Sequence, residues 1–230
     1  MKWLLAAGCL LTCLACNVAS YSEDVITPSP RADPVRYVAL GDSFTIGTSI
    51  HGGDAWPNQL VEALGDRVPL ELVGNLAVNG YTSDDLIRAE IPALADLQPE
   101  FVSILIGVND VVRDVPPDRY RTNVAQILGA TLGVVPHDRI VVVSTPDYTR
   151  TPRGADFGDS EQQRAAIEEV NAIMAAEAAA RGIAFVDISS IADQVGDDSS
   201  LVAADLLHPS AMQYGRWVEL IAPVVEGLFR

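Results

Sequence analysis

Short apolar segments alternate with amphipathic segments along most of this chain. Near-continuous apolar runs predict buried strands at 35–40, 70–73, 101–106, 140–144 and 183–188. Apolar residues at helical spacing predict helices at 56–64, 84–97, 120–132, 160–181 and 214–228. Pro92 is expected to interrupt the second of these helices, and Pro223 to bend or break the last.

Strands of this apolar kind, alternating with helices, indicate a parallel sheet whose two faces are both covered. The pattern therefore predicts one doubly wound, three-layer α/β domain over residues 35–230. In such sheets, ligands bind beyond the carboxyl ends of the strands. The loops that directly follow the strands are thus the places to look for chemistry.

The first predicted strand is followed by Gly41-Asp42-Ser43. A strand-to-helix turn of this kind can expose the Ser43 hydroxyl at a helix N-terminus, where the helix dipole favours negative charge. Taken alone, the same residues are more typical of an ordinary turn and N-cap.

Three further segments supply complementary groups. Gly80 follows the second strand and can bring its backbone N–H close to a ligand, although Asn-Gly is also a common turn. Asn109 follows the third strand, where its side-chain amide can donate to an anionic oxygen or cap the next element. Asp205 and His208, three residues apart, would share a face if they form a helical turn, and the carboxylate could then orient the imidazole.

Together these segments contain every part of an acyl-transfer site: a nucleophile, a base, an orienting carboxylate and oxyanion donors. The chain order Ser…Asp…His is one of the orders known among convergent catalytic triads. The combination is far more informative than any of its members.

The motifs resemble those of the SGNH, or GDSL-type, hydrolases over about residues 35–228. The first block of that family corresponds to 41–47, the second-block glycine to Gly80, the third block to 107–110 and the fifth block to 205–209. The resemblance implies a flavodoxin-like fold with a five-stranded parallel sheet in the order 2-1-3-4-5.

The resemblance also implies roles for these residues. Ser43 is the expected nucleophile, His208 its general base and Asp205 the carboxylate that orients the base. The backbone N–H groups of Ser43 and Gly80 and the amide of Asn109 are the expected oxyanion donors. The rate should rise with pH as a histidine loses its proton, near pH 6.5.

Two more aspartates flank these positions. Asp42 either supports the Ser43 turn or caps the following helix, and the sequence does not decide between the two. Asp110 either supports the Asn109 loop or acts as a cap, and we favour the cap.

Composition narrows the chemistry further. The formal net charge is −16, which argues against a surface for nucleic acid, because that needs a basic face. All three cysteines lie within the first sixteen residues, so a disulfide scaffold and a zinc-thiolate site are excluded from the remainder. Phosphate-binding and dinucleotide motifs are missing, and we expect neither a metal nor another cofactor.

Residues 1–16 place one positive charge before an apolar run that is too short for a comfortable membrane span, and they predict an export signal. Cys13-Leu14-Ala15-Cys16 partly resembles a bacterial lipobox, which implies a lipid on Cys16 and attachment to the cell envelope. Cleavage after Ala15 or Ser20 would instead release a secreted protein. Residues 17–34 are polar, contain three prolines and predict a linker.

The resulting hypothesis is an exported serine esterase that forms an acyl-enzyme and acts on small-molecule or lipid esters, in the manner of a lysophospholipase. A carbohydrate O-acetyl esterase or an acyltransferase of the same family are the alternatives. A non-catalytic binding lipoprotein is disfavoured, because Ser43 and His208 are both retained.

Overall fold

A five-stranded parallel sheet organises residues 33–230, the part of the chain that the computed structural model describes. The predicted export signal and nearly all of the predicted linker lie outside these residues. The strand order β2-β1-β3-β4-β5 and the parallel pairing confirm the expected flavodoxin-like topology. The strands are β1 (Val35–Gly41), β2 (Leu70–Asn75), β3 (Phe101–Leu105), β4 (Ile140–Val143) and β5 (Ala184–Val186).

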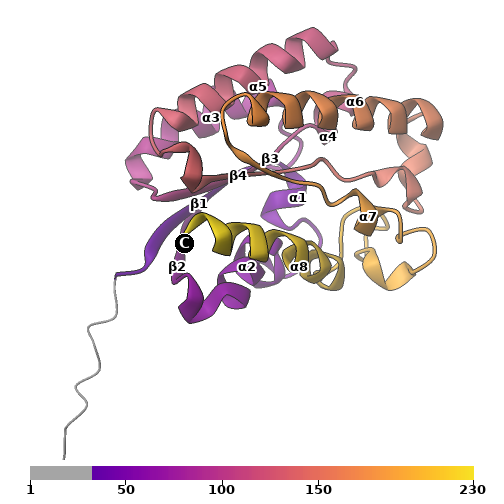
Figure 1. Ribbon diagram of the computed structural model, residues 1–230. Helices are drawn as coiled ribbons and strands as arrows, with labels where there is room; N and C mark the ends of the chain where they lie inside the picture. Colours follow the sequence, from indigo (N-terminus) through magenta and orange to yellow (C-terminus); the bar gives the residue numbers. More distant parts are fainter. Residues whose placement is uncertain (1–32) are drawn as a thin grey trace, which may run out of the picture. The chain divides into compact units, whose positions relative to one another are not determined.

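Helices cover both faces of the sheet and make the three layers visible in Figure 1. One face carries α3 (Ser83–Leu94), α5 (Pro117–Leu132) and α6 (Ser160–Ala179), which pack side by side. The other face carries α2 (Trp56–Leu64) and α8 (Ala211–Leu228), which pack against each other. This arrangement explains why the central strands are apolar on both faces: their side chains meet a helix rather than water.

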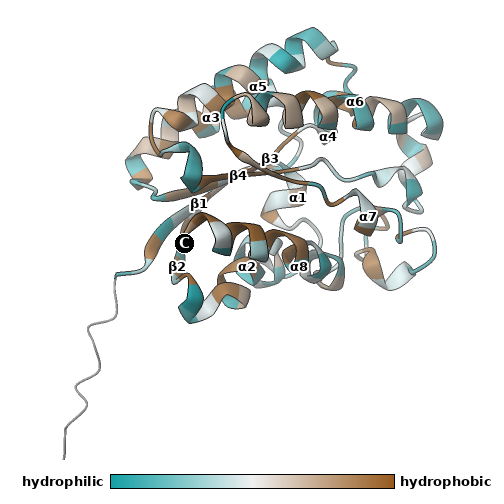
Figure 2. Ribbon diagram, in the orientation of Figure 1, coloured by the Kyte–Doolittle hydropathy of each residue, from teal (hydrophilic) through white to brown (hydrophobic). Residues whose placement is uncertain are grey.

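The hydrophobic core lies between these layers. Every residue of β3 and β4 is buried, and the strands stand out as brown ribbons in Figure 2. Trp56 and Trp217, on the two helices of one face, are fully buried. Burying a large apolar side chain contributes about 1.5–3 kcal/mol, so this core is the main source of the fold's stability.

Three short helices follow strands, and the apolar pattern does not predict them. They are α1 (Ser43–Ile46), α4 (Val108–Val112) and α7 (Ser189–Ala192), each five residues or fewer. Single 3-10 turns complete the connections, at Gly52–Asp54, Gly65–Arg67, Ala95–Leu97, His137–Arg139, Tyr148–Arg150, Gly154–Phe157 and Ser199–Leu201. No helix within residues 33–230 is long and apolar enough to cross a membrane.

The two proline-containing helices continue where an interruption was expected. Pro92 lies inside α3, and Pro223 lies inside α8. A proline within a helix costs about 3 kcal/mol or more. In α8, however, Tyr214, Trp217 and Ile221 are fully buried on the sheet-facing side, and their combined burial outweighs that cost.

Candidate active site

The segment that carries Ser43 is a tight connection between β1 and α1. Asp42 is the N-cap of α1: its Oδ1 accepts a hydrogen bond from the Phe44 N–H at 2.9 Å. Gly41 is required just before it, since a Cβ there would lie 2.3 Å from the Leu105 carbonyl oxygen on β3. Ser43 therefore begins α1 at the carboxyl end of β1, where the sequence places it.

The segment that carries Asp205 and His208 is an irregular turn, which corrects the expectation of a helical turn. Leu206 has a φ of 66°, in the left-handed region, and this reverses the chain between the two site residues. Asp205 Oδ1 accepts the backbone N–H groups of Leu207 and His208, each at 3.0 Å. Asp205 Oδ2 lies 2.6 Å from His208 Nδ1, so carboxylate and imidazole meet as expected.

The charge of Asp205 is well supported. Partial burial opposes ionisation, but hydrogen bonds from His208, from the Ser49 hydroxyl and from the two backbone amides hold the pKa of Asp205 well below its usual value. An ionised Asp205 can accept Nδ1–H of His208 and leave Nε2 free to take a proton.

Gly80 lies in a tight turn and can contribute its backbone N–H to the site. The Tyr81 N–H donates to the Val78 carbonyl, and Gly80 has a φ of 79° at the third position, as in a type II turn. Within residues 33–230, the N–H groups of Gly80 and Ser43 have no hydrogen-bond acceptor. Both are therefore available to a ligand.

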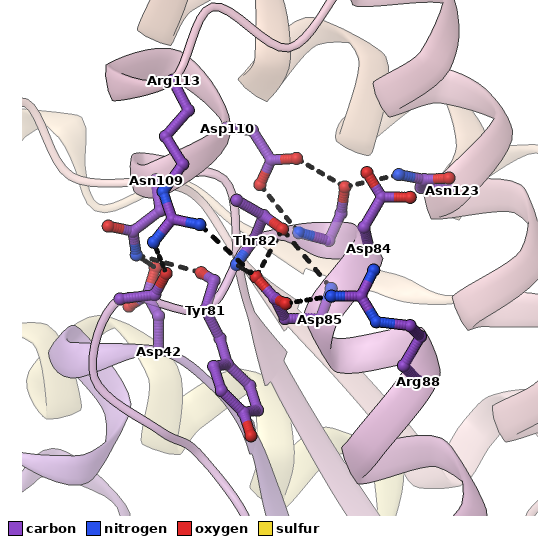
Figure 3. A network of polar contacts seen from close by, with 12 residues as sticks. Asp42, Tyr81, Thr82, Asp84, Asp85, Arg88, Asn109, Asp110, Arg113 and Asn123 are labelled. Atoms are coloured by element: carbon purple, nitrogen blue, oxygen red, sulfur yellow. Dashed lines mark hydrogen bonds and ion pairs between the residues drawn. The ribbon is translucent and has the colours of Figure 1, made fainter.

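Asn109 lies in the first turn of α4, directly after β3. Its Nδ2 donates to the Tyr81 carbonyl at 3.0 Å and to Asp42 Oδ2 at 3.3 Å, as Figure 3 shows. The contact with Asp42 is the longer and hence the weaker of the two.

Asp110 joins two site loops to each other. Its carboxylate accepts the Ser83 N–H at 2.9 Å and the Ser83 hydroxyl, and Asn123 also donates to that hydroxyl (Figure 3). Asp110 thus binds the first residue of α3 and braces the loop of its neighbour Asn109 as well. Asp42 likewise combines both roles considered for it, since it caps α1 and contacts Asn109.

Arg113 fixes the Gly80 turn from the other side. Its Nη2 donates to the Gly80 carbonyl at 2.7 Å, and its Nη1 lies 3.7 Å from Asp85 Oδ2 (Figure 3). Asp85 in turn accepts from Thr82 in a capping box at the start of α3. The Gly80 turn is therefore held at two points, by the bond between the Tyr81 N–H and the Val78 carbonyl and by the bond from Arg113 to the Gly80 carbonyl.

These segments meet at one cavity of about 200 Å³. Ser43, Gly80, Asn109 and His208 all line it, and a 5.0 Å ring contact between Phe44 and His208 joins two of the segments. The structure shows no hydrogen bond between the Ser43 hydroxyl and His208, both of them described residues; such catalytic bonds commonly tighten only with substrate bound. The remaining lining is mostly apolar: Phe44, Val108, Val112, Tyr148, Phe157 and Leu207.

Three carboxyl groups are buried next to Ser43 and behave differently from Asp205. Burial raises the pKa of Asp42 to about 7, although the Phe44 N–H opposes the shift, and that of Asp110 to about 6 against two hydrogen bonds from Ser83. Burial raises the pKa of Glu90 to about 9, because the single N–H of Gly41, at 2.8 Å, does not compensate for lost hydration.

Several residues of the site were not predicted from the sequence. Ser49 contacts Asp205, Arg113 contacts Gly80 and Glu90 contacts Gly41, each across a large separation in sequence. Serine, arginine and glutamate at these positions have no motif around them that would single them out. Of two aromatic residues that flank the site loops in the sequence, Tyr148 lines the cavity, whereas Trp56 is buried in the core.

Comparison with known proteins agrees with the fold and the motifs. The sequence profile of the GDSL-like lipase/acylhydrolase family matches residues 39–216. An arylesterase of Vibrio mimicus is 30% identical over 94 residues, which are 40% of this chain and 46% of that protein. The chain therefore matches about half the length of this curated relative.

Solved structures show the same architecture. A lipase/acylhydrolase from Enterococcus faecalis superposes with a TM-score of 0.66 at 19% identity, over 84% of this chain and 96% of that one. An acetylxylan esterase from Geobacillus stearothermophilus gives 0.63 at 20% identity, over 84% and 93%. At such identities the likeness concerns the fold.

Proposed function

Because the chain belongs to the GDSL-like lipase/acylhydrolase family, we propose that this hydrolase is a serine esterase acting through Ser43, His208 and Asp205. One observation carries the proposal: Ser43, His208, Gly80 and Asn109 line a single cavity, and Asp205 holds His208 at 2.6 Å.

In the proposed reaction, His208 Nε2 removes the proton of the Ser43 hydroxyl as Oγ attacks the ester carbonyl carbon. The carbonyl oxygen becomes an oxyanion, which the N–H groups of Ser43 and Gly80 and the amide of Asn109 can stabilise. His208 then protonates the alcohol oxygen, the ester C–O bond breaks, and the acyl group remains on Ser43. Water attacks that acyl group by the same steps and restores the free enzyme.

The cavity favours small acyl groups. Its volume of about 200 Å³ lies below the ~300–1,000 Å³ typical of pockets for drug-sized ligands. Val108, Val112 and Phe157 give it an apolar wall suited to a hydrocarbon or acetyl group. We therefore expect short-chain carboxylic esters to be better substrates than long-chain lipids.

An acetyl ester of a carbohydrate is the second candidate, since an acetyl group fits the same small cavity. The two candidates differ in the alcohol that leaves. Acyl p-nitrophenyl esters of increasing chain length, a lysophospholipid and an acetylated xylan, assayed side by side, distinguish them. An added alcohol that captures the acyl group would indicate acyltransferase activity.

Covalent labelling tests the proposal itself. A fluorophosphonate should label the parent protein at Ser43 and abolish ester hydrolysis, and Ser43→Ala should neither react nor hydrolyse. Ser210→Ala is the matched control, because Ser210 is likewise a serine at the start of a helix, as the N-cap of α8, and does not line the cavity. Undiminished hydrolysis by Ser43→Ala would refute the mechanism.

The proposed location is outside the cytosol, with a lipid on Cys16 as the anchor. This rests on the sequence of residues 1–16. Metabolic labelling with a fatty acid should mark the full chain and should fail for Cys16→Ser. Labelling that persists in Cys16→Ser would exclude that anchor.

A further inference from the structure

Ser49 connects two segments of the site that are far apart in the sequence. Its hydroxyl donates to Asp205 Oδ2 at 2.7 Å across 156 positions of the chain. The same carboxylate oxygen lies 2.6 Å from His208 Nδ1. Asp205 Oδ2 therefore accepts from the base and from Ser49 together.

The geometry of Asp205 makes this second donor significant. Its other oxygen, Oδ1, is occupied by the backbone N–H groups of Leu207 and His208. Those bonds hold Oδ1 to the turn, whereas Oδ2 is held from its own segment only by the His208 ring. The Ser49 hydroxyl approaches Oδ2 from a different segment and restrains it further.

The backbone of Ser49 is held in an unfavourable conformation. Its φ is 67°, in the left-handed region, which costs of order 1–3 kcal/mol for a residue other than glycine. The chain on either side is fixed, because the Thr48 N–H donates to the Ser43 carbonyl and the Ile50 N–H to the Gly47 carbonyl. This conformation places the Ser49 hydroxyl on Asp205.

The segment of Ser49 also contacts the other parts of the site. The neighbouring Thr48 hydroxyl donates to the side chain of Asn79, next to Gly80. Two adjacent residues thus touch the turns that carry the nucleophile, an oxyanion donor and the orienting carboxylate.

Building on the function proposed above, we propose that Ser49 is a positioning residue: its hydroxyl fixes Asp205 in the orientation that aligns His208 with Ser43. Ser49 does not touch the reacting atoms in this role. It acts through Asp205 and also disperses part of the carboxylate charge that would otherwise act on His208.

Removal of the hydroxyl has a defined electrostatic sign. Without the Ser49 donor, the charge on Oδ2 acts more fully on the imidazolium and favours it, so the base gives up its proton at higher pH. Tyr214 is a further titratable group that feels the charge of Asp205, and burial raises its pKa well above the ordinary value. Tyr214 therefore stays protonated over the acid limb, so a shift of that limb in a Ser49 variant reports on the Ser49–Asp205 contact.

The experiment compares Ser49→Ala with Ser49→Gly. Both remove the hydroxyl, but glycine also relieves the left-handed strain and should raise the free energy of unfolding. For both variants we expect kcat to fall about three- to tenfold, the range that corresponds to the typical net contribution of one hydrogen bond, with KM within about twofold. The acid limb of kcat/KM should move to higher pH by about 0.3–1 unit.

Two further variants and one spectroscopic reading complete the test. Ser49→Asn, which tolerates a left-handed backbone and keeps a donor, should recover part of kcat. Gln98→Gly, at another left-handed residue outside the cavity, should gain stability without a change in kcat. An NMR titration of the His208 ring in Ser49→Ala should show the same shift in midpoint without any turnover.

The outcomes separate this inference from the function on which it rests. If Ser49→Gly keeps the parental kcat and the NMR midpoint does not move, Ser49 is not a positioning residue, whatever the enzyme does. If the parent shows no Ser43-dependent hydrolysis, the proposed function fails. In that event a shifted NMR midpoint would still support the Ser49–Asp205 contact, and an unshifted one would overturn it.

Discussion

Two kinds of carboxyl group surround the Ser43 turn, and they differ in how their charge is met. Asp205, on an accessible loop, receives hydrogen bonds from His208, Ser49 and two backbone amides, and its pKa is held low. Glu90, enclosed below the turn and 2% exposed, receives one bond from Gly41, and burial raises its pKa to about 9.

The difference teaches that the degree of burial together with the number of hydrogen-bond donors, and not closeness to the nucleophile, decides which carboxyl group carries charge. A carboxylate that must stabilise an imidazolium has to be ionised, and Asp205 has the donors for that. A carboxyl group that stays neutral at pH 7 can hold the strand end at Gly41 without placing a negative charge beneath a developing oxyanion.

The largest expected effect comes from removing the ionised member of this pair. Asp205→Asn should lower kcat by about 10³–10⁴, because an amide cannot stabilise the imidazolium and favours the wrong ring tautomer. Asp159→Asn is the matched control: Asp159 accepts two backbone N–H groups at the start of α6, as Asp205 does in its turn, but meets no histidine. Initial rates on a short-chain p-nitrophenyl ester decide, and equal rates for the two variants would break the comparison.

The next largest effect is expected at Asn109, which contacts Asp42 and lines the cavity. Asn109→Ala and Asn109→Asp should each lower kcat by about 10²–10³, the usual loss for one oxyanion donor. Asn109→Asp keeps the size of the side chain and adds a charge on the buried side, so its loss should be at least as large. If Asn109→Asp retains the parental kcat, the Asn109 side chain does not stabilise the oxyanion.

A smaller loss is expected when the brace of the Gly80 turn is removed. Arg113→Met should lower kcat about three- to tenfold with little change in KM, because the Gly80 N–H is then less well oriented. Arg119→Met is its control, since Arg119 is similarly exposed and pairs with Asp84 in the same region without touching Gly80. Steady-state kinetics that find the two variants alike would assign Arg113 to stability alone.

The smallest effect on catalysis is expected at the neutral member of the pair. Glu90→Gln replaces a protonated acid by an amide of the same shape and should leave kcat at pH 7 within about threefold, with Gly41 still hydrogen-bonded.

The substitution Glu90→Gln should have a clear effect on how the free energy of unfolding depends on pH. The folded pKa of Glu90 lies above its unfolded value, so the folded state holds the extra proton. The parent should lose stability between about pH 4.5 and 9, by up to ~1.4 kcal/mol per pH unit. Denaturant unfolding of Glu90→Gln across that range should show a smaller loss, limited to the contributions of Asp42 and Asp110, whereas Glu71→Gln, at an exposed glutamate of β2, should keep the full loss. Parallel curves for the parent and Glu90→Gln would mean that Glu90 is charged at neutral pH.

The strands and the motif residues of the site could be predicted from the sequence. Local sequence patterns predict where the strands lie, and the resemblance to a family predicts their order. The same resemblance identifies four residues that line the cavity: Ser43, Gly80, Asn109 and His208. Each of these residues lies in a loop that follows a strand or in a short turn, where the position in the sequence largely determines the position in space.

The supporting residues could not be predicted in this way. Ser49, Glu90 and Arg113 act through contacts to Asp205, Gly41 and Gly80 that exist only once the sheet is assembled. The continuation of α8 through Pro223 has the same origin, because tertiary burial overrides a local preference. The turn at 205–208 differs from a helical turn because Leu206 adopts a left-handed conformation that its residue type does not indicate.

The acyl-enzyme is the most direct test of the central claim. The parent protein is mixed with p-nitrophenyl acetate and quenched in acid within the first turnovers. The quenched protein is then digested, and the masses of its peptides are measured by mass spectrometry. The account predicts one acetyl group on the peptide that contains Ser43, and none on that peptide from Ser43→Ala. An acetyl group on a different residue, or rapid hydrolysis with no acylated peptide in the parent, would contradict it.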